Sequence, residues 1–360
     1  MPFFLKNALL GFALSISFST ASMMHAATVQ ASQWQGPLNG IDNALLKPHY
    51  QSLHTSALSL ADQGKQLCLN PTAAELDKTR LAFKQNLLDW QAVQWLNYGP
   101  VTYFMRYYAI EFWPDKKGLT ARQLKQLVNN EQSSSDQAFW KSASIAVRGL
   151  TAMENILYRA SFNPIEHANY CQLLVNISQH HASSTQDIAV NWQQNEASSW
   201  VFVEEDSSAD PHQVALELII QQWLEHMSMV KESKIETPIG FHGKAKPKMA
   251  EFTLSNSSLS AIRKNLTLYP EIYHAGQPSL YDLAMQHNKQ QAQVLETALN
   301  ENIRLAAQLP EDVFASDLTK EQRIAHFKPL ISAISSSQSQ VLELVTQLGF
   351  EIGFNSRDGD

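Results

Sequence analysis

The chain of 360 residues lacks several features that define common protein classes. It has only two cysteines, and they form no C-x-x-C spacing, which excludes a zinc site built from cysteines. There is no H-E-x-x-H sequence, and no glutamate follows any of the twelve histidines three or four residues later. The local zinc-protease motif is therefore excluded. The sequence also contains no Walker loop, dinucleotide fingerprint, EF-hand or G-x-S-x-G elbow.

Positive charge is scarce as well. The chain has 27 Lys and Arg against 34 Asp and Glu, a formal net charge of −7. This balance argues against nucleic acids and anionic membrane surfaces as partners. No stretch after the N-terminal segment is apolar and long enough to predict a transmembrane helix.

The first residues have the layout of a secretory signal peptide. Lys6 is the only charge in residues 1–26, an apolar run extends from Ala8 to Phe18, and small residues follow. Cleavage after Ala21, Ala26 or Ala27 fits this layout equally well. The mature protein, with a charge of −8 after the loss of that one lysine, is expected to be soluble and exported.

An exported chain folds in an oxidising compartment, where an isolated pair of cysteines usually forms one disulfide. The sequence therefore predicts a bond between Cys68 and Cys171. This bond would join the end of the first long helix to the start of the fourth.

Apolar residues recur at helical spacing through most of the chain, and no segment alternates as a strand. An irregular arm is expected at 27–47, a loop at 234–250 and a tail at 351–360. The predicted helices span 48–68, 72–97, 120–128, 145–158, 164–193, 211–231, 257–268, 278–308 and 320–348. The predicted fold is all-α, with two tandem up-and-down bundles, 48–205 and 206–350, of about four long helices each.

One predicted helix contains two residues that need an explanation. Residues 145–158 present an apolar face, yet they include Gly149 and Glu154. Glycine within a helix costs about 1 kcal/mol relative to alanine, so Gly149 is expected to allow the close approach of another backbone or a bound group. Thr151 and Glu154 project together because they are three residues apart.

Three clusters combine polar and aromatic residues. The first holds Arg106 and the segment from Ile110 to Asp115, the second runs from Gly149 to Glu154, and the third runs from Glu251 to Leu259. Each also has a purely structural interpretation: a bundle cap, a helix crossing and a helix N-cap.

Together with the capped helix that leads to Trp90 and Trp95 and the Gly-Pro after it, these clusters resemble the imelysin family over about residues 60–350. The resemblance implies two helical bundles with a shared site, in an exported bacterial protein associated with iron uptake. The family is classed with metallopeptidases because of a Gly-x-His-x-x-Glu motif. Gly149 and Glu154 match this motif, but Thr151 stands at the histidine position.

Threonine is a poor zinc or iron ligand and no general base near neutral pH, so the departure argues against peptidase activity. Leu254 stands where the family often has arginine. The resemblance carries six residues over to this chain as candidate site residues. They are Gly149, Thr151, Glu154, Glu251, Ser255 and Ser258.

The leading hypothesis is a periplasmic, non-catalytic binding component of iron uptake in a Gram-negative bacterium, with its site in the cleft between the bundles. Glu154 and Asp115 would supply negative charge or ligate a metal, with Glu154 the metal ligand and iron or another divalent metal the candidate cofactor. Arg106 or Arg148 would balance this charge. The alternatives are a metallopeptidase, or a scaffold that docks on a membrane-bound uptake component through the aromatic residues between Tyr103 and Trp113.

Overall fold

The computed structural model describes residues 32–129, 137–201, 209–314 and 317–351. Within these ranges the chain consists of helices joined by turns and loops, without a strand, so the all-α prediction is confirmed. From Ser32 onward the chain forms one compact unit. Its division into bundles 48–205 and 206–350 stays a prediction. The predicted signal peptide and nearly all of the tail lie outside the described residues.

The described chain contains both long and short helices, and η marks the 3₁₀ and π segments. Their bounds are α1 Gln35–Gly40, η1 Ile41–Leu46, α2 Lys47–Leu69, α3 Ala73–Gln91, η2 Gly99–Met105, α4 Arg106–Ile110, α5 Leu119–Val128, α7 Gln137–Ser142, η3 Ile145–Val147, α8 Leu150–Tyr158, η4 Ala160–Phe162, α9 Ala168–Gln194, η5 Ala197–Trp200, α10 Pro211–Ser228, η6 Met229–Glu236, α11 Thr237–Ile239, η7 Pro247–Met249, α12 Ser258–His274, α13 Leu280–His287, α14 Lys289–Ala307 and α15 Lys320–Leu348.

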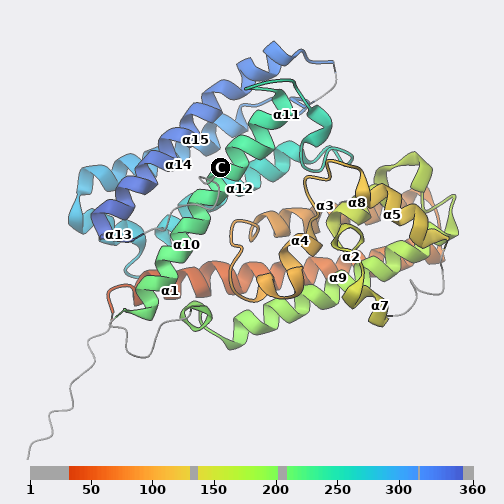
Figure 1. Ribbon diagram of the computed structural model, residues 1–360, viewed down its shortest axis with the longest axis horizontal. Coiled ribbons are helices and arrows are strands. Elements are labelled where there is room, and N and C mark those ends of the chain that lie inside the picture. The colour runs from red at the N-terminus through yellow and green to blue at the C-terminus, as the bar shows by residue number, and fades with distance from the viewer. Residues whose placement is uncertain (1–31, 130–136, 202–208, 315–316, 352–360) are drawn as a thin grey trace, which may run out of the picture. The chain divides into compact units, whose positions relative to one another are not determined.

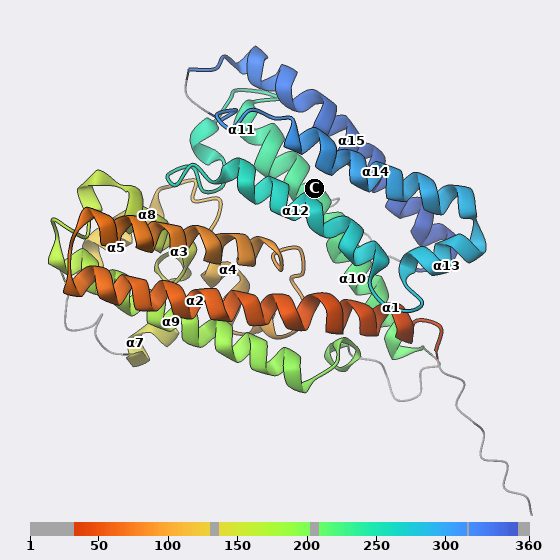
Figure 2. The same cartoon turned by 180° about the vertical axis from the view of Figure 1, so that it is seen from behind.

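The N-terminal half is built around three long helices. In both views α2 lies alongside α3 and α9, and α8 packs against α3 and α9 (Figures 1 and 2). Leu53, Leu60 and Leu67 recur every seven residues along α2 and are fully buried, so a single face of this helix meets its neighbours. A disulfide between Cys68 and Cys171 joins the end of α2 to the start of α9.

The C-terminal half is built around α12, α14 and α15, and α13 packs against each of them (Figure 1). A capping box between Thr319 and Gln322 starts α15. Gly349 ends this helix with a φ of 69°, a left-handed conformation that glycine adopts without strain. The bounds of α15 agree with the sequence prediction.

One continuous apolar core extends through both halves, from Trp34 to Phe350. The contact between α3 and α12 lies within it, and buried side chains of both helices contribute to the same cluster. The region where the halves meet is therefore packed like the interior of a domain.

The predicted arm is helical from residue 35 onward. Here α1 and η1 run directly into α2, and Leu38, Ile41 and Leu45 are buried at helical spacing. The predicted loop at 234–250 also begins later than expected. The helix from Pro211 continues through η6 and α11 to Ile239, because Val230, Ile235 and Ile239 extend its buried face.

Further helix boundaries differ from the prediction. The helix predicted at 72–97 ends at Gln91. The helix predicted at 278–308 is two helices, because the Asn288 side chain accepts a hydrogen bond from the Gln291 amide and starts α14. At the start of α5 the Asp115 carboxylate accepts hydrogen bonds from the amides of Leu119 and Thr120, at 2.7 and 3.0 Å.

Gly149 lies before α8, so its predicted position within a helix is wrong. A Cβ atom at this residue would lie 2.2 Å from the carbonyl oxygens of both Ala109 and Ile110. Only glycine lets the two backbones pass at this distance. The expected close approach is therefore to another backbone, at the end of α4.

Gly149→Ala is expected to lower the free energy of unfolding by at least about 2 kcal/mol, because both contacts are to backbone atoms that cannot rotate away. Gly243→Ala is the matched control, since nothing lies within 4 Å of a Cβ atom built there. Urea unfolding of both variants measures the difference. Equal stability of the two variants would contradict this account of the α4–α8 crossing.

Candidate functional site

A cluster of buried polar side chains lies where the halves meet. It is called the central polar cluster here, and its members are Gln91, Gln94, Glu111, Lys234, Glu251 and Asn265. Gln91 and Gln94 come from the end of α3 and the turn after it, and Glu111 follows α4. Lys234 belongs to η6, Glu251 to the segment before α12, and Asn265 to α12. Such side chains are rarely buried unless they are paired, so their partners define the arrangement.

Lys234 is the centre of this cluster, and its side chain is fully buried. Its Nζ atom donates hydrogen bonds to Gln91 Oε1 at 2.7 Å, Gln94 Oε1 at 2.5 Å and Asn265 Oδ1 at 2.7 Å. Glu251 Oε2 lies 2.9 Å from the same nitrogen and forms an ion pair with it. Because an ammonium has three protons, the amide oxygens use its whole donor capacity, and Glu251 compensates its charge.

Glu111 lies in the same network. Its Oε2 atom accepts hydrogen bonds from Trp90 Nε1 at 2.7 Å and Gln94 Nε2 at 2.9 Å. The same Gln94 amide group also donates to Glu251 Oε1 at 2.9 Å. Burial, and next the charge of Glu251, raise the pKa of Glu111 well above its usual value. Glu111 therefore takes up a proton more readily than an exposed glutamate, and Lys234 and Glu251 form the ion pair of the cluster.

Glu154, on α8, is a second buried carboxyl close to this cluster. Its Oε1 atom accepts hydrogen bonds from the Ser255 amide at 2.9 Å and the Ser255 hydroxyl at 2.7 Å. Burial raises the pKa of Glu154 to about 7, although the hydrogen bonds from Ser255 lower it. Glu154 therefore changes charge close to neutral pH.

A cavity of about 400 Å³ adjoins Glu154, and it is called the Glu154 pocket here. Residues from both halves line it, including Trp113 and Phe252. Its polar lining residues are Glu111, Asp115, Thr151, Glu154, Asn155, Arg159, Thr253 and Lys248. Acidic, basic and hydroxyl groups thus face one space, as in a site for a small polar ligand.

The structure brings most of the residues predicted from the sequence to this region. Asp115, Thr151 and Glu154 line the pocket, and Ser255 holds Glu154. The Ser258 hydroxyl donates to the backbone carbonyl of Glu251, which stabilises the turn before α12. Thr151 donates to the Phe112 carbonyl at 3.2 Å.

Arg106 is not brought to the pocket, contrary to the expectation that it balances the acidic groups. It pairs with Asp187 of α9 at 2.8 Å instead. Arg148 lies outside the pocket lining as well. The basic groups of the pocket are Arg159 and Lys248.

Lys234 is the main residue that the sequence analysis missed, because a loop was predicted at its position. The apolar residues Val230, Ile235 and Ile239 gave a signal that could have placed it in a helix, since they continue the helical spacing of α10. Glu111 was within the first polar cluster but was not singled out.

The carboxylates here do not fit a tightly held resident metal. The Glu154 oxygen that faces Ser255 accepts two hydrogen bonds. Glu251 pairs with Lys234, Glu111 accepts a hydrogen bond from Trp90, and both carboxyls accept one from Gln94. Among the described residues, no group of three or more His, Cys, Asp and Glu side chains could hold a metal ion. We therefore derive no chemistry through a bound metal.

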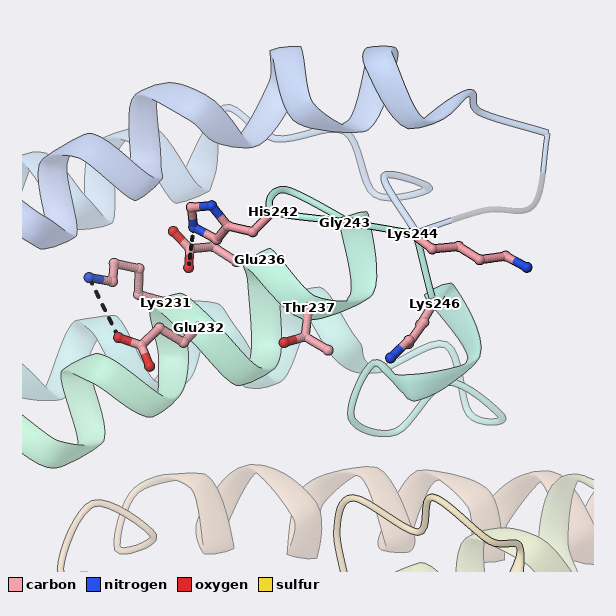
Figure 3. A pocket seen from close by; sticks show the side chains of 9 residues that line it. Lys231, Glu232, Glu236, Thr237, His242, Gly243, Lys244 and Lys246 are labelled. Atoms are coloured by element: carbon pink, nitrogen blue, oxygen red, sulfur yellow. Dashed lines mark ion pairs between the residues drawn. The ribbon is translucent and has the colours of Figure 1, made fainter. Parts of the chain in front are cut away.

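A larger pocket, of about 550 Å³, lies beside η6 and the turn after α11 (Figure 3). Two pairs of charged groups lie in its lining, Lys231 near Glu232 at 3.7 Å and His242 near Glu236 at 3.5 Å. The His242 side chain is 76% exposed, so water screens this pair. Size alone does not make this open pocket the better candidate.

The fold and the site define an all-α protein with a buried polar centre between two halves. A sequence model of the imelysin family matches residues 46–341, and the chain belongs to this family. It is 24% identical over 325 residues to iron-regulated protein A of Synechococcus elongatus, with 86% of each chain covered.

Solved structures show the same fold. An imelysin-like protein from Psychrobacter arcticum superposes with a TM-score of 0.75 and 24% identity, over 88% of this chain and 96% of that chain. A structure described as an iron-regulated protein A precursor from Parabacteroides distasonis gives a TM-score of 0.72 at 15% identity, over 90% and 97% of the two chains.

The pKa of Glu154 generates a prediction about stability. Between pH 4.5 and about 7 the folded protein holds a proton that the unfolded chain has released, so the free energy of unfolding falls as the pH rises through this window. The loss amounts to about 3 kcal/mol. In Glu154→Gln this loss is expected to disappear, while other titrating groups keep the remaining slope. Denaturant unfolding across the window measures it, and parallel curves for the two proteins would refute the assignment.

Lys234→Met is expected to destabilise the protein by about 3–5 kcal/mol, because it leaves Glu251 charged and buried without its partner. The double variant Lys234→Met/Glu251→Gln is expected to recover part of this loss, since it removes the unpaired charge. Lys231→Met serves as the control, because Lys231 forms only a partly exposed pair and its loss costs under about 1 kcal/mol. Equilibrium unfolding compares the three, and a double variant no more stable than Lys234→Met would be evidence against the ion pair.

Proposed function

We propose that the protein is a periplasmic, non-catalytic binding component linked to iron uptake, whose ligand occupies the Glu154 pocket. The single observation that carries this proposal is the pocket itself, where Glu154, Asp115 and Thr151 of one half face Lys248 and Thr253 of the other. The family and the name of the Synechococcus relative support the link to iron.

The side chain of Thr151 supports binding over catalysis. Its hydroxyl donates to a backbone carbonyl, so it acts as a structural hydrogen-bond donor at the position of the family histidine. A threonine hydroxyl neither ligates zinc or iron well nor takes up protons near neutral pH. Iron is therefore expected as cargo that arrives with ligands of its own and is held in part by the acidic groups of the pocket.

The N-terminal sequence supports export, because residues 1–26 have the layout of a signal peptide. None of the described helices is long and apolar enough to cross a membrane. A periplasmic location is part of the proposal.

A metallopeptidase is the alternative implied by the family classification. It needs ligands brought together from distant parts of the chain. Incubation of the mature protein with iron or zinc and an unfolded protein substrate tests it, and cleavage that EDTA abolishes would favour this alternative over ours.

An adaptor function has one observation in its favour. Tyr103, Phe104, Met105 and Tyr108 are all about half exposed or more, and Phe104 reaches 79%. Exposed apolar groups that lie together often mark interaction surfaces. A membrane-bound uptake component is the partner to which such a surface would be assigned.

The proposal predicts that the mature protein binds iron through Glu154. Iron is added as ferrous ion or as ferric citrate, and bound metal is measured by elemental analysis after desalting and by calorimetric titration. Glu154→Gln keeps the Ser255 hydrogen bonds but removes the charge, and it is expected to weaken binding about tenfold or more. Glu236→Gln is the matched control, because Glu236 is a buried glutamate outside the pocket. Absence of binding for both iron forms, or equal binding by the two variants, would refute the proposal.

A further inference from the structure

Arg148 lies between η3 and α8, and its charge has no acidic partner among the described residues. The residue is half-buried, and burial lowers the pKa of its guanidinium, with no carboxylate of the described chain near enough to raise it. Nη1 donates a solvent-exposed hydrogen bond to the Lys141 carbonyl at 3.4 Å, while Nε is enclosed by the protein. A guanidinium that is partly removed from water without a counter-charge favours the binding of an anion at its exposed end.

Further positive groups lie close to Arg148. They are Lys141 of α7 and Arg106 of α4, and both are near His180 of α9. Burial, and next the charge of Arg148, lower the pKa of His180 to about 4, and the charges of the other two cations act in the same direction. Asp187 is the acidic group that opposes them, and α9 contains no other. Three cations thus lie around one neutral imidazole, in a chain whose formal net charge is −7.

Packing fixes these side chains in place. The helix α7 packs against α9 and lies beside it in both views (Figures 1 and 2). From α7 the Trp140 ring stacks with that of His180, with the ring centres 6.3 Å apart. Arg106 forms its ion pair with Asp187 at 2.8 Å, and its guanidinium lies 5.3 Å from the centre of the Phe104 ring. His180 and Asp187 are seven residues apart and share one face of α9, so the positive groups gather along this face.

The balance of charge favours a ligand with two negative charges. Asp187 compensates Arg106, whereas Arg148 and Lys141 form no ion pair among the described residues. A phosphate group with one ester bond carries a charge of about −1.5 to −2 at pH 7, which matches these two cations. The planar guanidinium fits two oxygens of such a group, and a lysine ammonium binds it as a point charge. A carboxylate carries only one charge, so a phosphate group is the better match.

We propose that Arg148, Lys141 and His180 form a binding site for a phosphate group, either free or in a small phosphomonoester. The exposed end of Arg148 donates to two phosphate oxygens, Lys141 supplies the second charge, and the neutral imidazole adds one hydrogen bond. Arg148 and His180 are half-buried and Lys141 is exposed, so a ligand reaches all three from the surface. Arg106 contributes through its charge. None of these residues lines the Glu154 pocket, so the site is separate from the proposed iron ligand.

Titrations of the full mature protein test the proposal, at constant ionic strength and at slightly alkaline pH, where phosphate is mostly doubly charged. Inorganic phosphate, glycerol 3-phosphate and acetate are compared by calorimetry and by the NMR signal of the His180 ring, assigned from His180→Gln. Both phosphates are expected to shift this signal saturably and to bind about tenfold more tightly than acetate. The signal of His226, a buried histidine of α10, is expected to stay in place. Tighter binding of glycerol 3-phosphate than of inorganic phosphate would identify an ester as the ligand, and equal or weaker binding would identify free phosphate.

Arg148→Gln removes the charge and is expected to lower phosphate affinity about tenfold, whereas Arg148→Lys keeps the charge, loses the planar fork and should lower it about threefold. Arg304→Gln is the matched control, because Arg304 is an exposed arginine that pairs with Glu301 on α14, and its affinity should stay within about twofold. The His180 titration of the wild-type protein decides the matter even if Arg148→Gln fails to fold. No saturable shift of the His180 signal, acetate binding as tight as phosphate, or wild-type affinity in Arg148→Gln would overturn the proposal.

Discussion

The ammonium group of Lys234 is the interaction on which the junction between the halves depends. It is fully buried and surrounded by oxygens of Gln91, Gln94, Asn265 and Glu251. Removing an ammonium and a carboxylate from water costs several kcal/mol per ion. The arrangement persists because each of the three protons of the Lys234 ammonium has an acceptor. Two of these acceptors come from the N-terminal half and two from the C-terminal half. The cost of separating them holds the halves in one relative position.

This position sets the electrostatics of the neighbouring carboxyls. Glu251 supplies the negative charge that pairs with Lys234, and burial together with this charge raises the pKa of Glu111. Glu154 is farther along the same junction and is held by Ser255, so its pKa of about 7 reflects burial more than any single charge.

The sequence predicted features that depend on neighbouring residues and missed those that depend on distant contacts. The start and end of α15 were predictable because a capping threonine and a terminal glycine are local signals. Two cysteines left only one intramolecular pairing. Gly149 was misplaced because its conformation is set by the chain after α4, about forty residues earlier. Lys234 was missed because proline, glycine and lysine in the residues after it resemble a loop, whereas its burial depends on amides of α3 and α12.

The hydroxyl of Thr151 joins two segments at the Glu154 pocket. Its hydroxyl donates to the carbonyl of Phe112, in the segment that carries Glu111, Trp113 and Asp115. These three side chains line the Glu154 pocket, so the hydrogen bond fixes the pocket wall against α8. An imidazole at this position would extend farther and present a titratable nitrogen. The shorter threonine side chain donates its hydroxyl proton to a backbone oxygen instead. Thr151 thus ties this wall to α8 and supplies no base at its position.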